Sequence, residues 1–184
     1  MIKIYLADST KSSEHDDALK LAAYALYDTF GCEMPILKDA RGKPYVGKDG
    51  VYISIAHSHE RCLVAVSNSE IGVDIEYRSK DEARLIRIAE RYFTEKEAEY
   101  VKAKPSERFY EIWCAKESFI KFTGEGMARP LSSFCVFDSP LIFSHFDIDG
   151  YTLCVCSAEM TDTPPIYVKQ TQKQRTEQLC EHSI

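Results

Sequence analysis

Two acidic side chains on one predicted strand are the feature of this sequence best suited to chemistry. Asp74 and Glu76 alternate with isoleucine and valine in residues 71–76, and this two-residue period is typical of a strand. Both carboxylates would project from the same face, roughly 6–7 Å apart along the chain. Two negative charges at that distance repel each other unless a cation lies between them, so the pair predicts a cation site.

A later helical segment adds a third acid and a lysine. In residues 113–121, Glu117 and Lys121 lie one helical turn apart among apolar and aromatic side chains. A carboxylate in apolar surroundings is destabilising unless it is paired or bound to a metal ion. Carboxylates from two elements suit Mg²⁺, which prefers oxygen ligands, and a lysine suits a phosphate. The combination predicts a site for a divalent cation and a phosphorylated ligand.

Each of these features also has a plainer interpretation. Acids that alternate along a strand most often form its solvated face. Glu117 and Lys121 also fit an ordinary surface pair, worth a few tenths of a kcal/mol. The residues alone therefore leave both the metal site and a solvated surface open.

The composition is that of a globular protein rather than a nucleic-acid binder. The 184 residues carry a net charge of −6, which argues against a general nucleic-acid-binding surface. The seven cysteines match no zinc-ligand spacing, and Cys154 and Cys156 are expected to be small packing residues. No run approaches the ~18 apolar residues of a membrane span, and the first residues are typical of a strand rather than a signal peptide. We expect a cytoplasmic protein with reduced thiols.

The predicted elements that must position these residues fall into two groups. The first group combines one helix, which Gly31 ends, with strands at 2–7, 34–37, 51–56 and 62–67. The second group combines the acidic strand with helices at 81–92, 94–102 and 106–122 and with strands at 133–137, 141–146 and 151–157.

The similar order of strands and helices on the two sides of residue 68 predicts the fold. We expect an α+β fold of two similar α/β halves related by pseudo-twofold symmetry, with the site in a cleft between them. The halves would be residues 1–68 and residues 69–168, the second of which carries the metal site. The polar stretch at 169–184 is expected to be a flexible tail.

Several motifs, taken together, resemble those of the 4′-phosphopantetheinyl transferases. They are, in the family's order, Gly42-Lys43-Pro44 and residues 55–58, 72–76, 91–97, 113–121 and 124–134. The resemblance covers roughly residues 36–160 and is greatest to the monomeric type that activates nonribosomal peptide synthetases. It implies the fold of that family, with two similar halves.

The resemblance also implies roles for the acids and for the lysine beside them. Asp74, Glu76 and Glu117 match the family's Mg²⁺ ligands. Glu117 is in addition the candidate base for the proton of the attacking hydroxyl, directly or through a metal-bound water. Lys121 matches the lysine that contacts the coenzyme A pyrophosphate and offsets its charge. Glu117 and Lys121 are therefore the implied catalytic residues.

Further matches concern coenzyme A. His57 matches a histidine that contacts its phosphates, and Lys43 matches a lysine near its 3′-phosphate. Lys116 is a signature lysine, implied to hold the site together or to bind the ligand, and Glu97 matches an acid near the metal site. One departure is that residues 15–20 include two acids, Asp16 and Asp17, where the family often supplies basic residues for the 3′-phosphate.

The implied reaction is Mg²⁺-dependent transfer of 4′-phosphopantetheine from coenzyme A to a serine of an apo carrier protein, with release of adenosine 3′,5′-bisphosphate. The implied partners are coenzyme A and an acyl or peptidyl carrier protein, without nucleic acid or membrane, and the implied state is a monomer. Two alternatives stay open. One is a relative that binds coenzyme A or carrier protein without catalysis, and the other is an unrelated two-carboxylate metal enzyme acting on nucleotides.

Overall fold

The chain forms strands and helices in an order close to the predicted one. The first part of the chain contains β1 (Ile2–Asp8), α1 (Glu14–Phe30), β2 (Ile36–Lys38), β3 (Pro44–Val46), β4 (Tyr52–Ser58) and β5 (Arg61–Ser67). The second part contains β6 (Ile71–Tyr77), α2 (Glu82–Tyr92), α3 (Glu95–Lys102), α4 (Pro105–Thr123), β7 (Ile142–Ile148), β8 (Tyr151–Ser157) and β9 (Ile166–Tyr167). This computed structural model describes residues 1–10 and 13–169.

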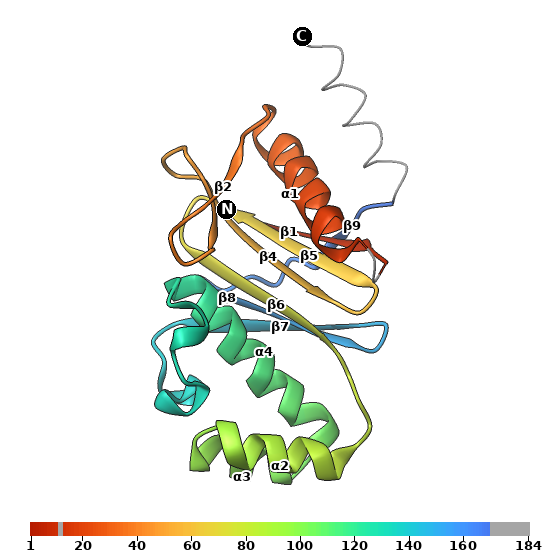
Figure 1. Cartoon of the computed structure of the whole chain (residues 1–184), viewed down its shortest axis with the longest axis vertical. Coiled ribbons are helices and arrows are strands. Elements are labelled where there is room, and N and C mark those ends of the chain that lie inside the picture. The colour runs from red at the N-terminus through yellow and green to blue at the C-terminus, as the bar shows by residue number, and fades with distance from the viewer. Residues whose placement is uncertain (11–12, 170–184) are drawn as a thin grey trace.

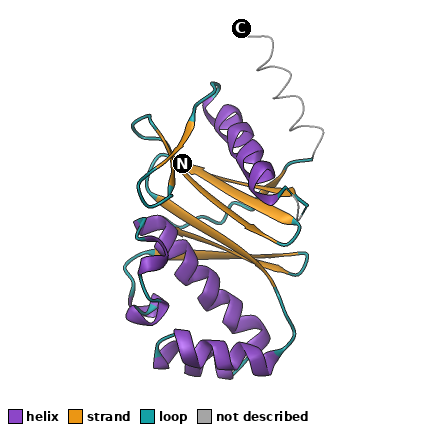
Figure 2. Cartoon of the chain, in the orientation of Figure 1, coloured by secondary structure: helices purple, strands orange, loops and turns teal. Residues whose placement is uncertain are grey.

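Two sheets lie at the centre of the molecule, and helices cover their outer faces (Figure 1). The strand order is β4-β5-β1-β9 in the first sheet and β6-β8-β7 in the second, while β2 and β3 form a separate hairpin. Helix α1 packs on the first sheet and α4 on the second, with α2 and α3 beyond α4 (Figure 2). Apolar side chains from both sheets share one buried cluster, which holds the two halves together. The mixed α+β class is therefore confirmed.

Three features differ from the predictions, the first being that β3 forms a hairpin with β2 where no strand was expected. The prediction of a strand at 133–137 is wrong, because this stretch forms 3₁₀ turns at Leu131–Ser133 and Val136–Asp138. Its backbone is bound by buried side chains instead of a neighbouring strand: the carbonyl oxygen of Phe134 accepts from Lys116, and the N–H of Val136 donates to Glu97. In addition, β9 returns to the first half and pairs in parallel with β1. The predicted tail lies, beyond residue 169, outside the described residues.

A glycine allows α4 to pack closely on the acidic strand β6. A Cβ atom added to Gly72 would lie 1.9 Å from the carbonyl oxygen of Ser118 and 2.5 Å from the backbone nitrogen of Phe122, both in α4. Because no side chain stands at residue 72, the face of β6 that bears Asp74 lies directly against the helix that bears Glu117.

Two serines join the sheets where β4 meets β6. The Ser54 hydroxyl accepts a hydrogen bond from the N–H of Val73 at 3.0 Å, and the Ser58 hydroxyl accepts one from the N–H of Tyr77 at 3.2 Å. These side chains satisfy backbone donors on the edge of β6, which would otherwise lack partners. The two sheets thus meet at this edge without merging into one ladder. Among the described residues, no helix has the length and apolar character needed to cross a bilayer.

Candidate functional site

Asp74 is a buried acid on the central strand of the molecule. Its side chain lies under α4 and the residue is only 5% exposed, so a solvated strand face is excluded for this acid. Oδ1 accepts a hydrogen bond from Lys121 at 2.8 Å. Oδ2 is buried and accepts no hydrogen bond from the described residues. A buried carboxylate oxygen without a partner is destabilising, and a cation would relieve this.

Glu76 and Glu117 are electrostatically coupled to Asp74. Burial, together with the charge of Asp74, raises the pKa of Glu76 to about 7, although Ser58 donates a hydrogen bond to it at 2.9 Å. Burial and then the charge of Asp74 also raise the pKa of Glu117, which Lys121 partly counteracts. The structure therefore brings the three predicted acids into one electrostatic environment, as alternation on β6 and the helical period of α4 indicated.

The donor chemistry of this environment fits a hard divalent cation. The three carboxylates come from β6 and α4. One of them, Asp74, has a buried oxygen without a hydrogen-bond partner among the described residues. Carboxylate oxygens are the ligands that Mg²⁺ prefers, with water and phosphate oxygens completing its shell. In the described residues, however, no three His, Cys, Asp or Glu side chains are already arranged to hold a metal ion. The acids thus suit Mg²⁺ in type but are not preassembled into a closed cage.

The raised pKa of Glu76 predicts how the stability of the metal-free protein depends on pH. Because the folded state favours the protonated carboxyl, the free energy of unfolding should fall as the pH rises from the usual value of 4.5 to about 7. Glu76→Gln removes this ionisation, so the fall should become shallower, with the remainder due to Glu117. Thermal unfolding midpoints in a chelator at a series of pH values measure both slopes. Parallel curves for the two proteins would contradict this account of Glu76.

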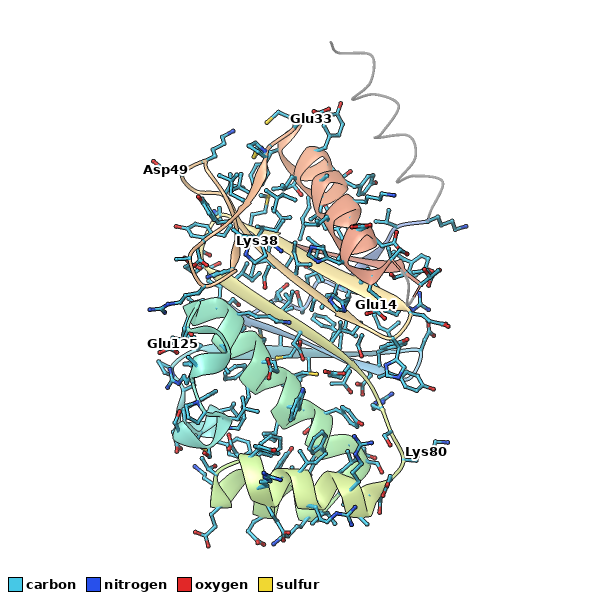
Figure 3. All side chains as sticks on the ribbon, in the orientation of Figure 1. Glu14, Glu33, Lys38, Asp49, Lys80 and Glu125 are labelled. Carbon is cyan, nitrogen blue, oxygen red and sulfur yellow. The ribbon has the colours of Figure 1, made fainter. Side chains whose placement is uncertain are left out.

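Lys121, the ion-pair partner of Asp74, lines a basic cavity. This cavity has a volume of about 280 Å³ and is bordered by parts of α1, the β2–β3 hairpin, β4 and the end of α4. Figure 3 labels Lys38 on β2 and Glu14 at the start of α1, two elements that border the cavity. The basic side chains that line it are His15, Lys38, Arg41, Lys43, His57 and Lys121. The predicted ligand residues Lys43, His57 and Lys121 thus lie at one cavity between the two halves.

Two of these cations also cap the helix that carries the third acid. Lys43 donates to the carbonyl oxygen of Phe122 at 2.8 Å and pairs with Glu70 at 2.9 Å. Arg41 donates to the carbonyl oxygen of Gly124 at 3.4 Å. These carbonyls lie at the C-terminal, negative end of the α4 dipole, where cations are stabilising. The β2–β3 hairpin therefore helps to position α4, a role that the motif Gly42-Lys43-Pro44 alone did not indicate.

His57 has an acidic neighbour. Its Nδ1 lies 3.3 Å from Oε2 of Glu14, in the first turn of α1. The acidic start of this helix, which the sequence marked as a departure from the family, therefore lies against a predicted coenzyme A ligand.

Lys116 and Glu97 form an ion pair inside the second half. Both side chains are fully buried, with Lys116 Nζ 2.8 Å from Glu97 Oε2. Lys116 also donates to the carbonyl oxygens of Leu131 and Phe134, and burial lowers its pKa. Because this ammonium is fully buried and bonded to protein atoms, the structure favours the other implied role of Lys116, which is to hold the site together. The pair ties α3, α4 and the 3₁₀ segment together.

Glu76 also borders a second, more aromatic cavity that sequence patterns did not reveal. It has a volume of about 540 Å³ and is lined largely by apolar and aromatic side chains, among them Leu85, Ile88, Phe109 and Trp113. The ring of Trp113 stacks on that of Phe109, with the two centroids 5.6 Å apart. Glu76 thus borders the apolar cavity, while Lys121 connects Asp74 to the basic one.

Comparison with known proteins gives one consistent family. The relative "4′-phosphopantetheinyl transferase gsp" of Aneurinibacillus migulanus is 39% identical over 103 residues, covering 54% of this chain and 42% of the relative. "4′-Phosphopantetheinyl transferase Sfp" of Bacillus subtilis is 32% identical over 137 residues, covering 64% and 60%, respectively. "4′-Phosphopantetheinyl transferase HetI" of Nostoc is 33% identical over 100 residues, covering 50% and 42%. The chain spans about half the length of these curated relatives.

A family model gives the same result for the part of the chain that carries the acids. The model for the 4′-phosphopantetheinyl transferase superfamily matches residues 70–162, which run from the residue before β6 past β8. The match includes Asp74, Glu76 and Glu117. This chain therefore belongs to the 4′-phosphopantetheinyl transferase superfamily.

Proposed function

We propose that this protein transfers 4′-phosphopantetheine from coenzyme A to a serine of an apo carrier protein, in a Mg²⁺-dependent reaction that releases adenosine 3′,5′-bisphosphate. The observation that carries this proposal is the position of three coupled carboxylates and Lys121 beside a cavity lined by cations from both halves. The matched relatives, each named as a 4′-phosphopantetheinyl transferase, support the same activity.

The acids and Lys121 divide the chemistry between them. Asp74, Glu76 and Glu117 would hold Mg²⁺, which supplies charge stabilisation to the pyrophosphate when bound. Lys121 donates to the phosphate oxygens and offsets the charge that grows on the leaving group. Glu117 accepts the proton of the serine hydroxyl, a role for which its raised pKa is suited because a base works best near the operating pH.

The two cavities suit the two ends of coenzyme A. The basic cavity would take the phosphorylated nucleotide, with His57 and Lys43 near its phosphates. The apolar cavity beside Glu76 would take the pantetheine arm, which carries no charge. The reacting phosphate would then lie between them, next to the acids and Lys121.

The remaining features of the proposal concern the whole chain. We propose that residues 1–68 and 69–168 are two halves related by pseudo-twofold symmetry, with β9 crossing back to pair with β1. We also propose that the protein acts as a monomer in the cytoplasm on an acyl or peptidyl carrier protein. Neither nucleic acid nor membrane is part of the proposed function.

One observation favours a second candidate, a relative that binds coenzyme A or carrier protein without catalysis. Glu70 and Glu14 already pair with Lys43 and His57, which weakens the basic set available for the nucleotide. Mass spectrometry of an apo carrier protein incubated with this protein, coenzyme A and Mg²⁺ separates the two. A gain of the phosphopantetheine mass supports transfer, whereas binding without any mass gain would leave only the second candidate.

Lys43→Ala tests which end of coenzyme A this lysine serves. We expect a higher KM for coenzyme A with a modest loss of kcat, because contacts made equally in the ground and transition states change mainly KM. With dephospho-coenzyme A, which lacks the 3′-phosphate, the same change should matter little. Steady-state kinetics with both substrates measure this, and Lys48→Ala, in the loop that follows β3, is the matched control.

Because Lys43 also caps α4, the same experiment has an outcome that would contradict its assignment to the 3′-phosphate. A loss of kcat that is equally large with dephospho-coenzyme A would show that Lys43 acts through Phe122 and α4. The 3′-phosphate would then be held by Lys38 or Arg41, which line the same cavity.

A further inference from the structure

Lys121 pairs with a buried acid and also lines the basic cavity. Its Nζ lies 2.8 Å from Asp74 Oδ1, while its side chain is among those that border the basic cavity. We propose that Lys121 is an internal counter-ion that a divalent cation displaces from Asp74, which frees its ammonium for the phosphate. This inference rests on the proposed metal site and goes beyond it.

The two partners of this ion pair differ in exposure. The Asp74 side chain is 8% exposed and the Lys121 side chain is 31% exposed. The acid is therefore fixed beneath α4, whereas the lysine reaches it from the cavity side. A lysine side chain has several rotatable bonds, so its ammonium can leave the acid while its backbone stays in the helix.

Charge balance makes the lysine an incomplete substitute for a divalent cation. One ammonium pairs with one oxygen of Asp74 and leaves Oδ2 without a partner. Burial, and then the charge of Asp74, raise the pKa values of Glu76 and Glu117 even with Lys121 present. A divalent cation on Asp74 would satisfy more of this negative charge, but even at the unpaired Oδ2 it would lie on the same carboxylate as the ammonium at Oδ1, and the two positive charges would repel each other. The two cations therefore compete for the same carboxylate.

A second lysine on α4 shows what a fixed structural lysine is like. Lys116 is fully buried and donates to Glu97 and to the carbonyl oxygens of Leu131 and Phe134, so its ammonium cannot move without losing each of these bonds. The ammonium of Lys121 makes one hydrogen bond to the described residues, and its side chain lines the basic cavity. The contrast identifies Lys121 as the lysine on this helix that is able to exchange partners.

Competition of this kind links the metal to the phosphate. When the metal holds Asp74, Lys121 is available to the phosphate, and when phosphate holds Lys121, Asp74 is available to the metal. Linkage requires each ligand to strengthen the other by the same factor. In the metal-free protein the lysine stays on the acid, so coenzyme A meets a weaker phosphate site.

Metal binding without coenzyme A tests the inference directly. Mn²⁺, a cation that also takes oxygen ligands, is titrated into the full chain, and free Mn²⁺ is followed by electron paramagnetic resonance. Lys121→Met, which keeps the length of the side chain but not its charge, should bind Mn²⁺ ~10-fold more tightly than the unchanged protein. This factor corresponds to the loss of one charged hydrogen bond that the metal must otherwise break.

Two matched variants show whether the effect belongs to this ion pair. Lys121→Arg keeps the charge and should bind Mn²⁺ about as the unchanged protein does. Lys38→Met removes a positive charge from the same cavity without touching Asp74, and its Mn²⁺ affinity should stay close to the original. Lys121→Gln provides a second neutral side chain if Lys121→Met does not fold, as judged by circular dichroism.

The outcomes separate this inference from the proposed function. If the unchanged protein and the variants bind no Mn²⁺, the metal site itself is overturned, and the inference falls with it. If the unchanged protein binds Mn²⁺ but the neutral Lys121 variants bind it equally or more weakly, the inference alone is overturned. Equal tightening in Lys38→Met would also overturn it, because a general loss of positive charge would then explain the effect.

Discussion

Asp74→Asn should abolish transfer of 4′-phosphopantetheine while leaving the fold intact. The amide has the shape of the carboxylate but not its charge, so it offers Mg²⁺ and Lys121 a much weaker partner. Because charge stabilisation by a metal is worth several kcal/mol, and each 1.4 kcal/mol is a factor of ten, the rate should fall on the order of 10³-fold or more. The fold should persist, since the change removes a buried negative charge, and the Oδ2 atom of Asp74 has no hydrogen-bond partner among the described residues.

Mass spectrometry of the carrier protein over time measures the loss of transfer, and thermal unfolding measures the fold. Glu117→Ala should give a similar loss, whereas Glu76→Ala should be damaging but less so, because water can replace one ligand on Mg²⁺. Asp138→Asn, at an exposed acid paired with Lys96, is the matched control and should leave the rate unchanged. Near-normal transfer by Asp74→Asn at any Mg²⁺ concentration would refute the assignment of this residue.

The acidic strand shows how far the sequence alone could go. The two-residue period correctly placed Asp74 and Glu76 on one face of β6, and the helical period correctly placed Glu117 and Lys121 on α4. Neither period says that the two faces meet. That contact depends on Gly72, whose missing side chain leaves room for the α4 backbone. A single glycine between apolar residues on a strand was the available signal for this close approach.

Sequence patterns did not reveal the structural contacts of residues whose partners lie far along the chain. Lys116 has the same local sequence signal as a ligand-binding lysine, but Glu97 and the carbonyls of the 3₁₀ segment bury it. The same two side chains turn residues 133–137 away from the strand that their composition favours. The local sequence around Lys43 indicates only a phosphate-binding role, whereas in the structure Lys43 also donates a hydrogen bond to the carbonyl oxygen of Phe122. Local periodicity carries no information on such distant hydrogen bonds.

The serines of β4 are a further case in which tertiary contacts decide. Ser54 and Ser58 would suit either face of a strand by composition, yet they complete the backbone hydrogen bonding of β6. Ser58 also donates to Glu76, so the first half of the chain orients one of the proposed metal ligands. The site is thus built by both halves, although the family model matches only the second.

Lys121→Ala should lower kcat by ~10²-fold or more, on the scale of losing one donor that stabilises charge in the transition state. The effect on KM for coenzyme A should be smaller, because the charge on the leaving phosphate grows as the bond breaks and the lysine meets it most strongly then. Steady-state kinetics at saturating Mg²⁺ measure both constants. Lys121→Arg should restore part of kcat, since a guanidinium keeps the charge but differs in shape.

The same variant separates two explanations for a loss of activity. If Lys121 competes with the metal for Asp74, Lys121→Ala should bind Mn²⁺ more tightly while it transfers phosphopantetheine more slowly, so loss of the metal cannot account for the slow rate. Lys96→Ala, on the exposed surface of α3, controls for a general loss of positive charge. A rise in KM with an unchanged kcat would contradict the transition-state role, because it would show that Lys121 only holds coenzyme A in the ground state.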